Sequence, residues 1–160
     1  MREFDYNGLL LATFQGKIFE QSVDRFESST PIFIRRFLHS ELLDRLDKND
    51  SYILSLDPIE AFNDIEEQFG VSSYGKIKYP KEALFWIGYM YRYISYTRNV
   101  TTWFLFKTFS FKQMLSVYYT YHTQDPEWCV ESLLELNHLD KNYLDCNYRY
   151  LNYLRQHRKQ

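Results

Sequence analysis

Bulky apolar residues dominate one continuous stretch of the chain, from Pro80 to Arg98. No residue between Ala83 and Met90 is charged, so a helix over this stretch would be apolar on every side. Such a helix is normally the buried centre of its domain. Arg92 then stands within a run of tyrosines, where its charge must reach solvent, form a pair or serve a site. The pattern predicts a central buried helix at about residues 80–98.

The flanking segments have the spacing of amphipathic helices. Residues 6–26 repeat apolar side chains three and four positions apart. A capping residue followed by proline, or a serine three residues before a glutamine, marks further helix starts. These starts are Thr30-Pro31, Asp57-Pro58, Ser110 with Gln113, and Asp125-Pro126. In the helix after Asp125, the residues expected to face inward are Trp128, Val130, Leu133 and Leu134. The last helix is expected at about residues 141–156.

The fold class follows from these helices and from the absence of a strand pattern. No segment alternates apolar and polar residues over a length that would indicate a strand. The chain has only 5 glycines and 4 prolines, which argues against a loop-rich fold. A length of 160 residues fits one domain. We expect an all-α fold in which residues 1–160 form one globular domain of six to eight helices around the central helix.

Charge is unevenly distributed along the chain. The formal net charge is −2 at pH 7, so the overall balance does not indicate a nucleic-acid partner. Residues 1–80 carry 9 Lys and Arg against 14 Asp and Glu, a net charge of −5. Residues 81–160 carry 10 against 7, a net charge of +3. This asymmetry either guides the docking of a partner or reflects an uneven solvated surface.

The cysteines and the apolar segments indicate a cytoplasmic location. Cys129 and Cys146 have no CxxC spacing, so we interpret them as packing thiols in a reducing compartment. The first residues, MREFDYNG, lack the apolar region of a signal peptide. No uncharged apolar segment approaches the roughly 18 residues that suggest a membrane span. We therefore expect no membrane association.

Familiar catalytic and metal-binding motifs are absent from the sequence. It contains no P-loop, GxGxxG, HExxH or GxSxG motif. The four histidines show no ligand spacing with one another or with cysteine: His39, His122, His138 and His157. We expect no metal site and no cofactor.

One face of the central helix nevertheless combines chemistry-bearing side chains. Helical spacing places Phe85 and Gly88 on this face, together with Tyr89, Arg92 and Tyr96. Tyrosines and His122 end a later helix and could face them. An arginine, a histidine and tyrosines at one site could bind phosphate or polarise a ribose. Under this interpretation the chain is an enzyme acting on RNA or nucleotides, HEPN-like or related to ADP-ribose chemistry, with three catalytic residues: Arg92, Tyr96 and His122.

A structural role is the alternative for Arg92. Ribonucleases of the HEPN type pair an arginine with a histidine four to six residues away, and no histidine follows Arg92 or Arg98 at that spacing. A carboxylate, Glu127 or Glu131, could instead hold Arg92 within a shell of tyrosine hydroxyls. Under this alternative the chain has no catalytic residues.

Other candidate binding residues lie outside the central helix. Arg35 and Arg36 could contact phosphates, or they could simply face solvent or form ion pairs. Fifteen tyrosines are far more than usual, and tyrosine is favoured at interfaces. Several of them, including Tyr148 and Tyr153, crowd the last helix. We interpret that helix as a lid on the core or a docking surface. The binding candidates are Arg35, Arg36, Tyr89, Arg92, Tyr148 and Tyr153.

The segments FWIGYMYRY at 85–93 and YHT at 121–123, with Tyr96-Thr97, Tyr118 and Asp125, resemble a pattern in one group of small helical proteins. These are uncharacterised proteins of low-GC Gram-positive bacteria that are encoded in toxin–antitoxin loci. The resemblance implies that the chain is an antitoxin or accessory component that binds a toxin. It implies stoichiometric binding by an aromatic-rich face and the acidic first half, with self-association as a further option.

Overall fold

The computed structural model describes residues 1–157, except for the side chains of residues 146–148. Tyr148, one of the predicted binding residues, therefore has a side chain that lies outside the described residues. Residues 1–157 contain nine α-helices, one 3-10 helix and no strand, which confirms the all-α class. The helices are α1 Tyr6–Arg25, α2 Thr30–Leu38, α3 Glu41–Asp47, the 3-10 helix η1 Ser51–Ser55, α4 Pro58–Phe69, α5 Lys81–Arg98, α6 Thr102–Thr108, α7 Phe111–Tyr121, α8 Pro126–Leu136 and α9 Cys146–His157.

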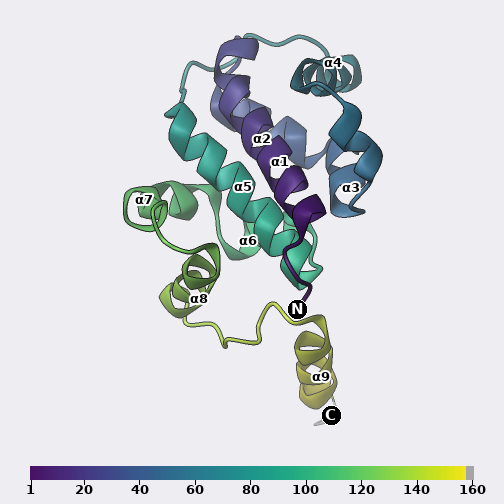
Figure 1. The fold of residues 1–160 in the computed structure, drawn as a ribbon. Helices are drawn as coiled ribbons and strands as arrows, with labels where there is room; N and C mark the ends of the chain where they lie inside the picture. Colours follow the sequence, from purple (N-terminus) through teal and green to yellow (C-terminus); the bar gives the residue numbers. More distant parts are fainter. Residues whose placement is uncertain (158–160) are drawn as a thin grey trace.

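Helix α5 is the buried centre of the domain, as the apolar stretch predicted. Leu84, Ile87 and Ile94 on this helix are 0 % exposed. Helix α1 packs along it, with α2, α3 and α4 beyond α1 and with α7 and α8 on the other side (Figure 1). Helix α6 packs against α5, and its first residue, Thr102, also bonds to Asp47 at the end of α3. Helix α9 lies apart from these layers at one end of the molecule (Figure 1). Within residues 1–157, no helix combines the length and the hydrophobicity needed to cross a membrane.

Glycines allow α1 and α5 to approach each other closely. A Cβ atom at Gly16 would lie 3.0 Å from the Phe85 carbonyl oxygen, and one at Gly88 would lie 2.8 Å from the Gln15 carbonyl oxygen. Gly8 lies against Tyr96, so the two helices run antiparallel. A side chain at Gly16 or at Gly88 would meet the backbone of the other helix.

Side-chain caps define most helix starts. Oxygen atoms of Ser29, Ser40 and Thr101 accept N–H groups of the first turns of α2, α3 and α6. Asp57, Ser110 and Asp125 do the same for α4, α7 and α8, in agreement with the predicted start signals.

The last helix begins later than predicted, at Cys146 rather than residue 141. The side chain of Asp140 accepts the N–H of Asn142 at 2.8 Å, and the Asp140 carbonyl accepts the N–H of Tyr143 at 2.8 Å. Such local bonds of aspartate compete with helix formation. Leu144, which is 1 % exposed, anchors this turn to the core.

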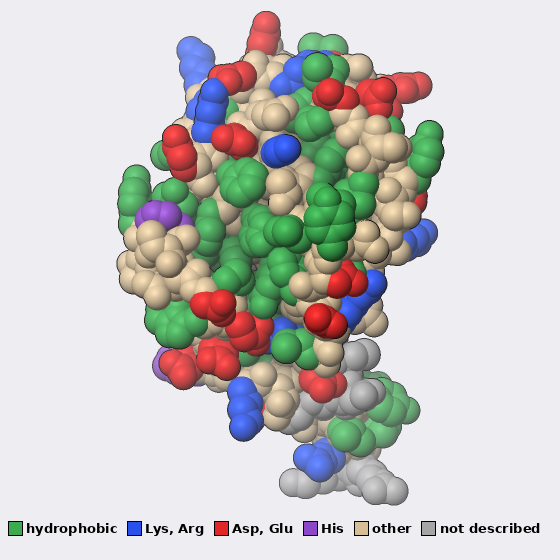
Figure 2. Space-filling model, in the orientation of Figure 1, with side chains coloured by type: hydrophobic (Ala, Val, Ile, Leu, Met, Phe, Trp, Pro, Cys, Tyr) green, Lys and Arg blue, Asp and Glu red, His purple; other side chains and the backbone are tan. Residues whose placement is uncertain are grey.

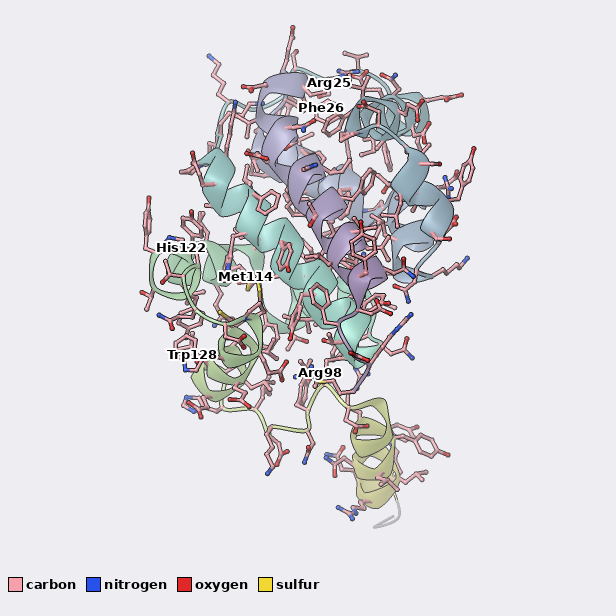
Figure 3. The ribbon with its side chains drawn as sticks, in the orientation of Figure 1. Arg25, Phe26, Arg98, Met114, His122 and Trp128 are labelled. Atoms are coloured by element: carbon pink, nitrogen blue, oxygen red, sulfur yellow. The ribbon has the colours of Figure 1, made fainter. Side chains whose placement is uncertain are left out.

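The burial of α8 differs from the prediction at one position. Cys129, Val130 and Leu133 are each 0 % exposed, whereas Trp128 is 43 % exposed. Trp128 lies at the outer edge of α8, with its ring edge against Tyr121 (Figure 3). Burial raises the pKa of the Cys129 thiol to about 11, so this cysteine is an unreactive packing group. The side chain of Cys146, the other predicted packing thiol, lies outside the described residues.

Candidate functional site

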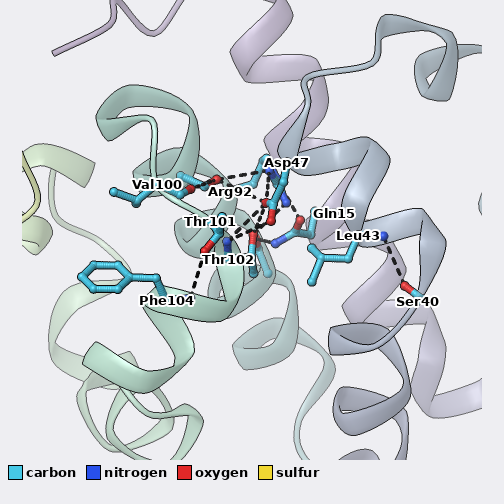
Figure 4. Close-up of polar contacts among 11 residues, drawn as sticks. Gln15, Ser40, Leu43, Asp47, Arg92, Val100, Thr101, Thr102 and Phe104 are labelled. Carbon is cyan, nitrogen blue, oxygen red and sulfur yellow. Dashed lines mark hydrogen bonds and ion pairs between the residues drawn. The ribbon is translucent and has the colours of Figure 1, made fainter. Parts of the chain in front are cut away.

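Arg92 lies at the centre of a buried polar network and is 0 % exposed. Its Nε donates to Oε1 of Gln15 at 2.9 Å, and its Nη2 donates to Oγ1 of Thr102 at 2.9 Å. Its Nη1 donates to Oδ1 of Asp47 at 3.0 Å and to Oγ of Ser95 at 3.3 Å. The guanidinium therefore joins α5 to α1, α3 and α6 (Figure 4).

The partners of Arg92 are themselves hydrogen-bonded. The Asp47 carboxylate accepts the backbone N–H of Thr102 at 3.1 Å and its hydroxyl at 2.7 Å. Ser95 Oγ donates to the Val100 carbonyl at 2.6 Å, and Gln15 Nε2 donates to the Gly88 carbonyl at 2.9 Å. Burial lowers the pKa of Arg92, and Asp47 opposes that shift. With no exposed surface, the Arg92 side chain cannot touch a substrate in this conformation.

A carboxylate holds Arg92, as the structural alternative predicted, but it belongs to Asp47 rather than to Glu127 or Glu131. Glu127 instead forms an ion pair with Arg98. It also accepts the Tyr93 hydroxyl at 3.0 Å. Burial, and after it the bond to Glu127, raises the pKa of that tyrosine.

Tyr96 is buried on the same side of α5 and faces the start of α1. Its hydroxyl donates to Oδ1 of Asp5 at 2.7 Å, and the Arg2 guanidinium lies 4.0 Å from the centre of its ring. The bond from Tyr96 is the main cause of the lowered pKa of Asp5. Burial, followed by the bond to Asp5, raises the pKa of Tyr96. The phenol thus fastens the chain before α1 to α5.

His122 lies elsewhere, at a mostly apolar cavity of about 310 Å³ between α5 and the end of α7. The cavity is lined by Phe85, Trp86, Tyr89, Met90, Tyr118, His122, Gln124 and Pro126. The His122 ring stacks on Tyr118 with 4.6 Å between centroids. Its Nδ1 lies 2.9 Å from the Tyr118 carbonyl, which can only accept, so Nδ1 carries a proton. Figure 2 shows hydrophobic side chains gathered over the centre of the face that contains α5.

The residues of the enzyme hypothesis therefore occupy separate places. The structure brings Tyr89 and His122 to one cavity. Arg92 is not among the residues that line this cavity, and its N–H groups are bound to other partners. Tyr96 is bound to Asp5. The arrangement provides no common contact surface for Arg92, Tyr96 and His122.

Arg35 and Arg36 lie together in the last turn of α2. They line a cavity of about 480 Å³ with His39. Arg36 Nη1 donates to the Gly70 carbonyl at 2.6 Å and so ties α2 to the end of α4. Arg35 is exposed.

Helix α9 presents its apolar residues to solvent. Four large side chains are exposed on this helix: Tyr150 62 %, Leu151 51 %, Tyr153 57 % and Leu154 41 %. They share one side of the helix because they are one, three and four positions apart. Arg149, on the other side, is half-buried, and its guanidinium carbon lies 4.2 Å from the centre of the Phe104 ring. The more polar side of α9 thus faces the domain.

Sequence reasoning missed all four residues that bond to the Arg92 guanidinium: Gln15, Asp47, Ser95 and Thr102. One signal for Gln15 was available, since it lies in the apolar stripe of α1 between Leu11 and Ile18. A polar residue at such a position needs a buried partner. Asp47 is 45 residues from Arg92 and begins the polar segment 47–51, so no local pattern identifies it.

Comparisons with known proteins add no functional assignment: no protein-family model, curated protein or solved structure matches this chain. Across the described part of the chain, no group of three or more His, Cys, Asp or Glu side chains could hold a metal ion. The fold and its surfaces define an all-helical domain with a closed polar core network, an apolar cavity at α5, a basic cavity at α2 and a last helix, α9, with an exposed apolar stripe.

Proposed function

We propose that this chain works by binding another protein through α9, as an antitoxin or accessory component of a toxin–antitoxin system. The observation that carries the binding role is the orientation of α9, whose apolar stripe faces solvent while Arg149 faces the domain. Exposed apolar patches with polar rims mark interaction sites. The choice of a toxin as the partner comes from the sequence resemblance.

The chemistry of α9 specifies the kind of surface that it would bind. Tyrosine and leucine dominate its apolar side, and its sequence contains Arg149, Arg155 and His157 but no Asp or Glu. A helix of this kind fits an apolar groove with an acidic rim. The domain supports α9 through Tyr143, whose ring stacks on Phe104 with 6.1 Å between centroids. The partner would therefore meet a helix that is already formed and held at one end.

The enzyme alternative receives no support from the geometry. An active site built on Arg92 and His122 needs both side chains within reach of one substrate. Arg92 is 0 % exposed and bound to Asp47.

The test begins with the gene encoded beside this chain, whose product the resemblance implies to be a toxin: the two are co-expressed, and binding of the purified pair is titrated. Tyr150→Ala combined with Tyr153→Ala removes two aromatic anchors from α9. Central aromatic anchors typically contribute about 2 kcal/mol or more to binding, so affinity should fall about 30-fold or more and rescue should fail. The matched control is Tyr6→Ala with Tyr52→Ala, since these tyrosines are 72 % and 67 % exposed but lie outside α9.

Two results would reject the proposal. One is equal binding by the α9 variant and the control. The other is failure of the wild-type chain to bind the neighbouring toxin while α9 binds anionic vesicles, because a basic amphipathic helix can also lie on a membrane.

A further inference from the structure

A basic cavity of about 480 Å³ lies between the end of α2 and the segment that follows α4. It is lined by Arg35, Arg36, His39, Ile32, Phe69, Ser72 and Tyr74. None of these lining residues carries a carboxylate. Its volume lies within the range of about 300–1,000 Å³ that is usual for small-molecule sites.

The positive charge of the cavity is not neutralised within the described part of the chain. Arg25 and Arg45 of the acidic first half pair with carboxylates, those of Glu66 and Asp50. Arg36 donates instead to the Gly70 carbonyl at 2.6 Å, which carries no formal charge. The guanidinium of Arg35 has no hydrogen-bond or ion-pair partner within residues 1–157. An anion in the cavity would meet two guanidinium groups without competition from a lining carboxylate.

Backbone contacts hold the His39 ring and the segment that carries Tyr74. His39 Nδ1 lies 2.8 Å from the Arg35 carbonyl, which orients the imidazole toward α2. The Tyr74 carbonyl accepts the N–H of Ser29 at 3.0 Å, and the Ile77 carbonyl accepts the next N–H of the chain at 2.9 Å. The segment that carries Tyr74 is thus bound to the start of α2. The Tyr74 side chain itself is 76 % exposed.

We propose that this cavity binds a mononucleotide, with its phosphate on Arg35 and Arg36 and its base against Tyr74. Arginine forks match phosphate oxygens in bidentate geometry, which gives both strength and orientation. Aromatic side chains bind bases of any sequence by stacking. Guanidinium groups and an exposed phenol around one cavity supply both kinds of contact.

The test is calorimetric titration of the full chain with AMP, inorganic phosphate and adenosine. AMP should bind more tightly than either of its parts. Arg35→Gln should weaken AMP binding about 10- to 100-fold, the range expected for lost charge-assisted hydrogen bonds. Lys112→Gln, which removes the same charge from an exposed position on α7, should leave binding unchanged.

A second variant separates the base contact from the phosphate contact. Tyr74→Ala should weaken AMP binding about 5- to 100-fold and leave phosphate binding unchanged, because only the stacking contact is lost. The Arg35 side chain holds no other residue, so circular dichroism should show an unchanged fold for Arg35→Gln. The proposal is overturned if AMP does not bind, if it binds no better than phosphate, or if Arg35→Gln and Lys112→Gln behave alike. These outcomes are independent of α9 and of any toxin.

Discussion

Arg92 and Asp47 form the one ion pair of the described chain in which the cation is fully buried. Desolvating such a charge is costly, so the pair adds little net stability compared with apolar residues of the same volume. It does, however, require that the end of α3 and the start of α6 meet α5 in one arrangement, because only that arrangement gives each guanidinium nitrogen of Arg92 a partner. The polar network selects a particular packing of helices whose apolar faces could pack in several ways.

This role predicts a large cost for removing one partner. Arg92→Met should destabilise the domain by about 3–5 kcal/mol, since it leaves the Asp47 carboxylate without its cation. The control is Arg45→Met, which breaks a pair with Asp50 at the same 3.0 Å separation but with side chains 35 % and 37 % exposed. Exposed pairs contribute about 0–1 kcal/mol. The measurement is urea unfolding of both variants, and equal losses would show that the buried network has no special role.

At the scale of helices, the close contact between α1 and α5 depends on glycine, which has no side chain. Gly16 and Gly88 bring the two backbones together, and Gln15 then reaches the Gly88 carbonyl and Arg92. These two glycines therefore explain both the close packing of α1 and α5, the two longest helices, and the position of the polar network. Glycine would ordinarily weaken a helix by roughly 1 kcal/mol relative to alanine.

Gly88→Ala distinguishes packing from helix propensity by the sign of its effect. Propensity alone predicts a gain of about 1 kcal/mol. The new Cβ would lie 2.8 Å from the Gln15 carbonyl oxygen and 2.8 Å from the Phe19 ring, so we expect a loss of about 1–3 kcal/mol from overpacking. Thr120→Ala, on the exposed side of α7, serves as a control and should stabilise slightly. A stabilised Gly88→Ala variant in urea unfolding would refute the close-contact explanation.

Local sequence patterns predict where helices form better than they predict which helices contact one another. The uncharged run of α5 and the caps at Asp57, Ser110 and Asp125 are properties of neighbouring residues, and the structure contains the elements that they indicate. The start of α9 was predicted wrongly because the Asp140 turn competes with helix over the same residues. The partner of Arg92 was not identified because it depends on how α3 and α6 meet, which no local period encodes.

At the scale of the whole molecule, the candidate binding surfaces lie in different regions. The apolar cavity with His122 lies between α5 and α7, and the basic cavity lies at α2. Helix α9, whose apolar side is exposed, lies at one end of the molecule (Figure 1). Within the described residues, α9 combines an exposed apolar stripe with few contacts to the core. A helix that stabilised the domain would be expected to bury that surface instead.

This division predicts that α9 contributes to binding but little to folding. Ending the chain after Asp145 removes α9 and, with it, the contact between Arg149 and Phe104. An exposed cation–π contact contributes about 0.5–1 kcal/mol, so urea unfolding should show a loss of no more than about 1 kcal/mol.

Leu144→Ala in the full chain is the opposite case, since Leu144 is 1 % exposed and truncating a buried leucine typically costs about 2–5 kcal/mol. The truncated chain should remain folded and lose partner binding, whereas Leu144→Ala should lose stability and, at temperatures where it remains folded, keep its binding. A truncation that unfolds the domain would instead identify α9 as part of its folding unit, and the exposed stripe would no longer indicate a docking helix.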